Sequence, residues 1–202
     1  ELRTPLSVLQ VNLHNAHLQW QQAGVADPAG IMPALQQGVE RMSQLIEQIM
    51  LLNRTNPAHF QAKLQPLELT ALCRDVIAQL YPKIQDKAQQ IELLGAEQCW
   101  LRADAFALRL LLVNLLGNAL KFTAQGEIEL HCALQTGDNS AAPSLRLSVR
   151  DTGIGIPTEL QHRVFQSFSQ VDSSIASRFG GNGLGLSITR GLVEAMGGVI
   201  GF

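Results

Sequence analysis

The chain has 202 residues, enough for one large domain or two modest ones, and its 46% of apolar residues can bury a core. Its 15 basic and 17 acidic residues give a net charge of −2, which argues against a surface built for nucleic acid or anionic lipid. Cys73, Cys99 and Cys132 lack CxxC spacing, so they indicate small buried residues rather than a disulfide framework or a zinc site.

Two long amphipathic helices are predicted at the start of the chain. Apolar residues recur at steps of three and four within residues 2–22, and residues 24–30 form a turn. A heptad seam then runs from Met32 to Asn53. A hairpin with such wide apolar faces cannot bury them alone. We therefore expect residues 1–53 to form a four-helix bundle with a second copy of the chain.

Beyond a linker at residues 54–63, short strands alternate with helices. Strands are expected at residues 64–69, 91–94, 99–102, 127–134 and 145–150. Helices are expected at residues 70–89, from an Asp104 cap to 121, at 158–168 and at 184–196. The absence of a regular βαβ repeat favours an α+β two-layer sandwich.

The first motif, NLLGNALKFT at residues 114–123, places two amides and an ammonium on one helical face. Asn114, Asn118 and Lys121 stand at i, i+4 and i+7. Amide oxygens can ligate the hard cation Mg²⁺ and a lysine can neutralise phosphate, so this face suits a magnesium–polyphosphate group. The alternative is an ordinary polar stripe that faces solvent.

Two glycine-rich motifs follow. In VRDTGIGIP, at residues 149–157, Asp151 ends a strand before a turn at Gly153 and Gly155, where it could accept a hydrogen bond from the exocyclic amine of a base. In RFGGNGLGLSI, at residues 178–188, glycines precede a helix and would expose backbone N–H groups to an anion. This motif is neither a P-loop nor a Rossmann turn. The alternatives are a plain strand–turn–helix connection and a flexible loop with a glycine hinge.

In their order along the chain, these motifs resemble the transmitter core of sensor histidine kinases. ELRTPL at the start resembles the end of the family's H box, NLLGNALKFT its N box, DTGIGIP its G1 box, FQSF its F box and GGNGLGLSI its G2 box. Residues 168–188 read most like the hybrid members. The resemblance implies a dimerisation and phosphotransfer hairpin at residues 1–56, then a two-layer α/β sandwich of the Bergerat ATP-binding type at residues 57–202.

The resemblance also implies roles for single residues. Asn118 would ligate Mg²⁺ with Asn114 beside it, Lys121 would meet phosphate oxygens, and Asp151 would bind the adenine amino group. The other implied nucleotide-binding positions lie in the G1, F and G2 boxes: Gly153, Gly155, Ile156, Phe165, Phe168, Arg178, Gly181, Gly183, Leu184 and Gly185.

The implied activity is ATP-dependent phosphorylation of a histidine, followed by transfer to the aspartate of a response-regulator receiver domain. In the family the phosphoacceptor precedes the H-box glutamate, so we expect a histidine immediately before Glu1, which Glu1 would orient and deprotonate. Thr4 would position a hydrolytic water in the reverse reaction. Without that histidine the chain is not expected to phosphorylate itself. A cytoplasmic location is expected, with any membrane anchor outside these residues.

Two other classes of protein stay open. ATPases of the same fold clamp DNA or client proteins, but they use a carboxylate on the N-box helix, and position 114 here is asparagine. A dimerisation module that only senses nucleotide is disfavoured by the intact N, G1 and G2 boxes. The sequence leaves the signal, the partner response regulator and the choice between phosphorylation within or between subunits undecided.

Overall fold

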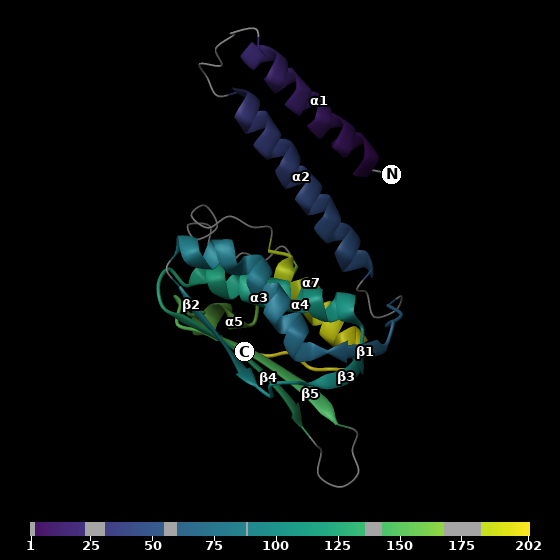
Figure 1. Cartoon of the computed structure of the whole chain (residues 1–202), viewed down its shortest axis with the longest axis vertical. Helices are drawn as coiled ribbons and strands as arrows, with labels where there is room; N and C mark the ends of the chain where they lie inside the picture. The colour runs from purple at the N-terminus through teal and green to yellow at the C-terminus, as the bar shows by residue number, and fades with distance from the viewer. Residues whose placement is uncertain (1–2, 23–30, 55–59, 88, 136–142, 168–182) are drawn as a thin grey trace. The chain divides into compact units, whose positions relative to one another are not determined.

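The structure is a computed structural model that describes residues 3–22, 31–54, 60–87, 89–135, 143–167 and 183–202. It divides into two compact units, Glu1–Arg54 and Thr55–Phe202. The first unit consists of two helices, α1 (Arg3–Gln22) and α2 (Ile31–Arg54), which lie side by side and run in opposite directions (Figure 1).

The heptad seam of α2 is only partly covered in a single copy of the chain. Met32 and Val39 are each 5% exposed, whereas Leu35 and Met42, from the same seam, are 49% and 48% exposed. Helix α2 therefore retains apolar surface that a single copy of the chain does not bury.

The second unit is an α+β structure with two small sheets. Strand β1 (Gln65–Glu68) pairs antiparallel with β3 (Trp100–Ala103). The larger sheet has the order β2–β4–β5, in which β2 (Gln90–Gly95) runs parallel to β4 (Glu127–Gln135) and β5 (Ser144–Asp151) runs antiparallel to it. The α+β class predicted from the sequence is confirmed.

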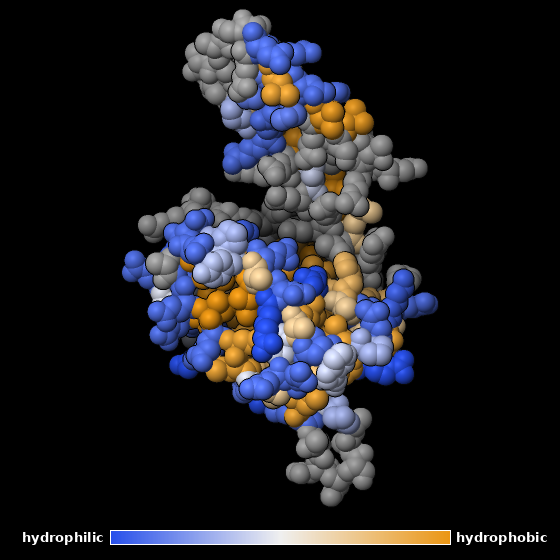
Figure 2. Space-filling model, in the orientation of Figure 1, coloured by the Kyte–Doolittle hydropathy of each residue, from blue (hydrophilic) through white to orange (hydrophobic). Residues whose placement is uncertain are grey.

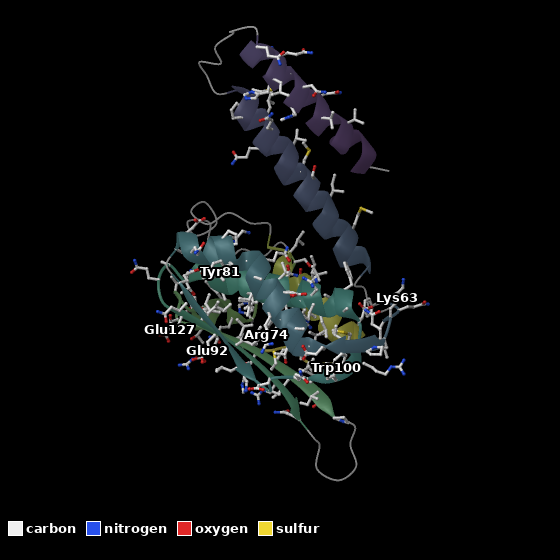
Figure 3. The ribbon with its side chains drawn as sticks, in the orientation of Figure 1. Lys63, Arg74, Tyr81, Glu92, Trp100 and Glu127 are labelled. Atoms are coloured by element: carbon white, nitrogen blue, oxygen red, sulfur yellow. The ribbon has the colours of Figure 1, made fainter. Side chains whose placement is uncertain are left out.

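Three helices lie over one face of the larger sheet: α3 (Leu69–Asp86), α4 (Ala105–Phe122) and α7 (Gly185–Ala195) (Figure 1). Helix α5 (Thr158–Gln161) is a single turn. The opposite face of the sheet carries charged side chains, among them the exposed Glu92 and Glu127 (Figure 3). Burial alternates along most of β5 and at the start of β2, because successive side chains of a strand point to opposite faces of the sheet.

One hydrophobic core joins the helices to the sheet. Buried residues recur at helical spacing along α3 and α4, and they alternate along β4. Cys73, Cys99 and Cys132 are all buried in or beside this core, as predicted. The Sγ atoms of Cys73 and Cys132 lie 3.5 Å apart. This shared hydrogen bond and burial raise the pKa of the Cys73 thiol.

Helix α4 is the central helix of this unit. Asp104 caps its start, because its Oδ1 accepts a hydrogen bond from the backbone N–H of Ala107 at 3.0 Å. The other oxygen, Oδ2, accepts from the backbone N–H of Lys63 at 2.8 Å and so connects the segment before β1 to the start of α4. Among the described residues, α4 is the one helix long and apolar enough to cross a membrane. It packs instead against α3, α7 and the sheet, so its apolar character belongs to the core.

Two helix predictions were too long. The helix predicted at residues 70–89 ends at Asp86, because Lys87 leaves helical geometry and the side chain of Gln89 is bonded to the end of α4. The helix predicted at residues 158–168 ends at Gln161. Beyond it the backbone makes short-range bonds, such as Arg163 N–H to Leu160 O and Gln166 N–H to Arg163 O, each at 3.0 Å. Such i to i+3 bonds form successive turns rather than an α-helix.

Candidate nucleotide-binding site

The N-box face of α4 meets the start of α7. The side-chain nitrogen of Asn114 donates to the carbonyl oxygen of Gly185 at 3.3 Å. A Cβ built on Gly185 would lie 3.7 Å from Asn114 Oδ1 and 3.7 Å from Asn118 Nδ2. Two motifs that are about 70 residues apart in sequence are thus brought together by the packing of α4 against α7.

The two asparagines differ in what they bind. Asn114 is tied to the Gly185 carbonyl, which also accepts from the Thr189 hydroxyl at 2.9 Å. Asn118 makes no hydrogen bond to any described residue, and it is half-buried. Its amide oxygen is therefore available to a ligand, whereas the Asn114 amide holds the start of α7.

Lys121 lies in the last turn of α4, one turn beyond Asn118. Its Nζ stands 4.7 Å from the centroid of the Phe122 ring, a cation–π contact. Burial lowers the pKa of its ammonium group. No described carboxylate pairs with it, so its charge is available to a bound anion.

Asp151 is the last residue of β5, and its two carboxylate oxygens have different surroundings. Oδ1 accepts from the backbone N–H of Gly153 at 2.9 Å and from the Thr123 hydroxyl at 3.4 Å. Oδ2 accepts no hydrogen bond from the described residues, and the residue is exposed. One oxygen thus fixes the turn while the other remains free to accept a bond from a ligand.

The turn after Asp151 requires its two glycines. A Cβ on Gly153 would lie 2.5 Å from the carbonyl oxygen of Phe122, so no side chain fits there. Gly155 has φ +68°, in the left-handed region that favours glycine. The N–H of Ile154 donates to the same Phe122 carbonyl at 3.3 Å. The G1 turn is therefore pressed against the end of α4, and Ile156 beside it is 39% exposed.

The G2 segment leads into α7. Gly183 has φ +64°, and the buried Leu184 is the N-terminal capping residue of α7. Leu184 has no side-chain group that caps the first N–H groups of this helix, and no other described side chain caps them. Free N–H groups at a helix start attract anions, so the end of α7 next to Asn114 and Asn118 has the character of a phosphate site.

The structure describes one of the two aromatic residues of the F box, whose role as a lid anchor stays a prediction. Phe165 stacks on Phe202, with ring centroids 6.0 Å apart. Glu1, Phe168, Arg178 and Gly181 lie outside the described residues, and for Thr4 the structure describes the backbone alone, within α1.

Three groups that connect these motifs were not predicted from the sequence: the Phe122 carbonyl, the Thr123 hydroxyl and the Gln89 amide. The Phe122 carbonyl and the Thr123 hydroxyl both contact the G1 turn, although Thr123 stands within the N-box motif. Gln89 lies outside every motif and donates to the end of α4. For Thr123 its place at the end of the N box was a usable signal, whereas Gln89 offers none in the sequence.

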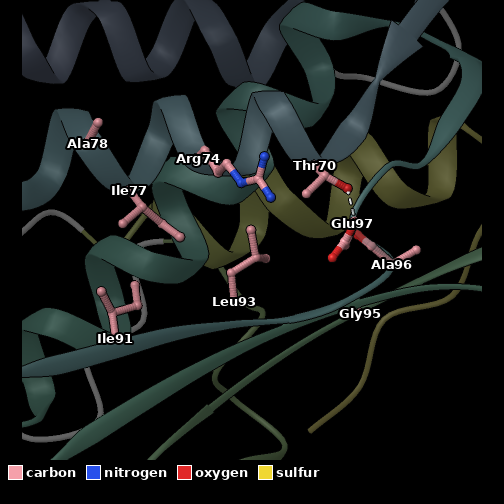
Figure 4. Close-up of a pocket in the computed structure, with 9 residues that line it drawn as sticks. All are labelled: Thr70, Arg74, Ile77, Ala78, Ile91, Leu93, Gly95, Ala96 and Glu97. Atoms are coloured by element: carbon pink, nitrogen blue, oxygen red, sulfur yellow. Dashed lines mark hydrogen bonds between the residues drawn. The ribbon is translucent and has the colours of Figure 1, made fainter.

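A separate groove of about 420 Å³ lies between α3 and β2, and none of the predicted site residues lines it (Figure 4). Ile77, Ile91 and Leu93 give it an apolar wall, and Arg74 lies at its rim. In the same region the space-filling view shows apolar surface interrupted by hydrophilic residues (Figure 2). None of the glycines of the G1 and G2 motifs lines this groove.

The comparisons with known proteins agree with this arrangement. Residues 103–202 match the family described as histidine kinase-, DNA gyrase B- and HSP90-like ATPase. The chain is 34% identical over 211 residues to the sensor histidine kinase AruS of Pseudomonas aeruginosa, covering 100% of this chain and 20% of AruS. It is 32% identical over 179 residues to the sensory/regulatory protein RpfC of Xanthomonas campestris, covering 88% of this chain and 25% of RpfC.

A solved structure shares the fold and part of the sequence. Full-length ShkA in complex with AMPPNP matches with a TM-score of 0.71 and 30% identity, over 87% of this chain and 35% of ShkA. The chain spans about a quarter or less of the length of the curated relatives named above. Residues 103–202 therefore form a histidine kinase-, DNA gyrase B- and HSP90-like ATPase domain, and the chain belongs with the histidine kinase cores of sensor proteins.

Proposed function

We propose that this chain is the core of an ATP-dependent protein-histidine kinase of a two-component system. The observation that carries the proposal is the meeting of Asn114 and Asn118 with Gly185. It brings the Asn118 side-chain amide, which makes no hydrogen bond to a described residue, beside the start of α7, an arrangement that suits a polyphosphate with a hard cation.

ATP is the proposed phosphoryl donor. The free Oδ2 of Asp151 would accept a hydrogen bond from the exocyclic amine of adenine, while Gly153 and Gly155 let the ring approach the backbone. Ile156, half-exposed at the end of the turn, would contact the base. The likeness to ShkA, whose structure contains AMPPNP, supports an adenine nucleotide here.

The phosphates would lie between α4 and the start of α7. Lys121 would contact phosphate oxygens, and Gly183, Leu184 and Gly185 would present backbone N–H groups. Asn118 would ligate Mg²⁺, with Asn114 holding α7 beside it. When bound, Mg²⁺ would neutralise charge on the transferring phosphoryl group. Phe165 would anchor one end of a lid, in which Phe168, Arg178 and Gly181 stay predictions from the sequence.

The helical unit would supply the dimer and the acceptor. The exposed Leu35 and Met42 support a homodimeric four-helix bundle through residues 1–53. A nitrogen of a histidine before Glu1 would attack the γ-phosphorus in line, the bond from that phosphorus to the bridging oxygen would break, and ADP would leave. Glu1 would orient the imidazole and take its proton, and Thr4 would place water in the reverse reaction. The phosphoryl group would then pass to an aspartate of a response-regulator receiver domain. The cytoplasmic location is part of the same proposal.

The test is phosphate incorporation from γ-labelled ATP by the chain extended upstream with its natural residues. We expect an acid-labile, alkali-stable label, as for phosphohistidine, and its loss when the histidine before Glu1 is changed to Gln. Asn118→Ala in the extended chain should also abolish labelling, whereas Asn15→Ala, the same change at an exposed position of α1, should leave it intact. Equal labelling with Asn118→Ala contradicts the assigned cation site, and labelling that survives the histidine change identifies another acceptor.

A further inference from the structure

The end of α4 is held by two side chains from the connection between α3 and β2. Lys87 Nζ donates to the carbonyl oxygens of Leu120 at 2.7 Å and Lys121 at 3.4 Å. Gln89 Nε2 donates to Leu120 O at 3.0 Å and also to the carbonyl oxygen of Thr123. The last carbonyls of a helix have no partner within the helix, so these two side chains take the place of the missing donors.

The two polar atoms of the buried Gln89 amide have different surroundings. It is 6% exposed, and its Oε1 is buried with no partner among the described residues. The other end of the amide faces the carbonyl oxygens of Leu120 and Thr123, which only accept hydrogen bonds, so that end is the NH₂ group. A buried acceptor without a donor destabilises the fold relative to an apolar side chain of the same size. The amide nitrogen therefore stabilises the end of α4, whereas the buried oxygen offsets part of that stabilisation.

The opposite side of the same helix end touches the G1 turn. The Thr123 hydroxyl donates to Asp151 Oδ1 at 3.4 Å, and the Ile154 N–H donates to Phe122 O at 3.3 Å. Gly153 lies so close to Phe122 O that a Cβ would not fit. Residues 122–123 thus contact both the Gln89 amide and the turn after Asp151.

We propose that Gln89 is a positioning residue for base recognition, acting through Thr123 on the carboxylate of Asp151. The proposal rests on the proposed function, in which Asp151 Oδ2 binds the adenine amine. By fixing the Thr123 carbonyl, Gln89 sets where the Thr123 hydroxyl meets Oδ1, and this determines where Oδ2 points. Lys87 supports the same helix end from a half-buried position, where its positive charge also suits a helix C-terminus.

The test variant is Gln89→Met, which keeps the size of the side chain and removes both the donor and the orphaned oxygen. Because the carbonyl oxygens of Leu120 and Thr123 lose a donor, we expect a lower thermal unfolding midpoint, with a transition that stays cooperative. Affinity for ATP and ADP, measured by calorimetry with Mg²⁺, should fall roughly three- to tenfold. Binding of inorganic tripolyphosphate, which has no base, should not change. Gln90→Met makes the same change on the exposed neighbour, whose side chain bonds to no described residue, and should alter none of these values.

Two further variants separate the possible outcomes. Lys87→Met loosens the same helix end from a half-buried position, so it should lower ATP affinity selectively even if Gln89→Met does not fold. In an Asp151→Ala background, Gln89→Met should cause no further loss of ATP affinity, because the effect passes through Asp151.

The inference is overturned if Asp151→Ala weakens ATP binding while Gln89→Met and Lys87→Met do not. It is also overturned if Gln89→Met weakens tripolyphosphate as much as ATP, or adds its full effect to that of Asp151→Ala, because either result describes a general loosening of the fold. If Asp151→Ala itself leaves ATP affinity unchanged, the failure lies in the proposed function.

Discussion

Asp151→Asn is the substitution that examines base recognition most closely. Oδ1 of Asp151 accepts from Gly153 N–H at 2.9 Å, and an asparagine oxygen can keep this bond. The free Oδ2 becomes an NH₂ group, which is a donor facing the donor amine of adenine. The loss of a charge-assisted hydrogen bond at an exposed residue corresponds to about 1.5–3 kcal/mol. ATP affinity should therefore fall roughly 10- to 150-fold.

The assay is calorimetric titration of ATP and GTP into the folded chain with Mg²⁺. GTP carries a carbonyl oxygen where ATP carries the amine, so the ratio of the two affinities should shift towards GTP. Asp75→Asn makes the same change on α3, where the carboxylate forms an exposed ion pair with Arg109 at 3.3 Å, and it should leave both affinities unchanged. An unchanged affinity for ATP in Asp151→Asn would refute the assignment of Asp151 to the base.

Four further predictions follow from other parts of the chain. Burial lowers the pKa of Lys121, and the ammonium form of this residue would bind phosphate, so ATP affinity should fall as the pH rises through the lowered pKa. Lys121→Met should weaken ATP binding and abolish this pH dependence in titrations from neutral to alkaline pH. Asp104→Ala removes the cap of α4 and the acceptor for Lys63 N–H, so urea denaturation should show a loss of about 2 kcal/mol. Asn118→Ala should reduce ATP affinity in Mg²⁺ but change little in EDTA, and an equal loss in both would exclude a role in cation binding. Met42→Lys should turn a dimer into monomers in light scattering, because it buries an unpaired charge; a monomeric unmodified chain at micromolar concentration would contradict the bundle.

The sequence predicted most elements because their signals are local. The period of Leu72, Val76 and Leu80 identifies α3 without any knowledge of its neighbours. The position where α3 ends is different, because Gln89 is bonded to α4 carbonyls more than 30 residues away in the chain. Residues 162–167 carry an apolar pattern compatible with a helix, and only the observed i to i+3 bonds show that they form turns.

In the candidate site, too, the sequence predicted which residues take part but not which contacts they make. Motif spacing placed Asn114 and Asn118 on one helical face. Only the packing of α7 shows that Asn114 is bonded to Gly185, whereas Asn118 makes no hydrogen bond to a described residue. Likewise, the G1 motif indicated Asp151, whereas the different surroundings of its two oxygens depend on Thr123 and on the backbone of the turn. Spacing along one element is visible in a sequence, and contacts between elements are not.

Calorimetric titration of ATP into the folded 202-residue chain, with and without Mg²⁺, tests the proposed nucleotide site. We predict saturable binding at one site per chain, stronger with Mg²⁺ and strongly reduced in Asp151→Asn. The proposed site does not exist if a folded sample releases or absorbs no heat with ATP under either condition and its unfolding midpoint does not move in the presence of ATP.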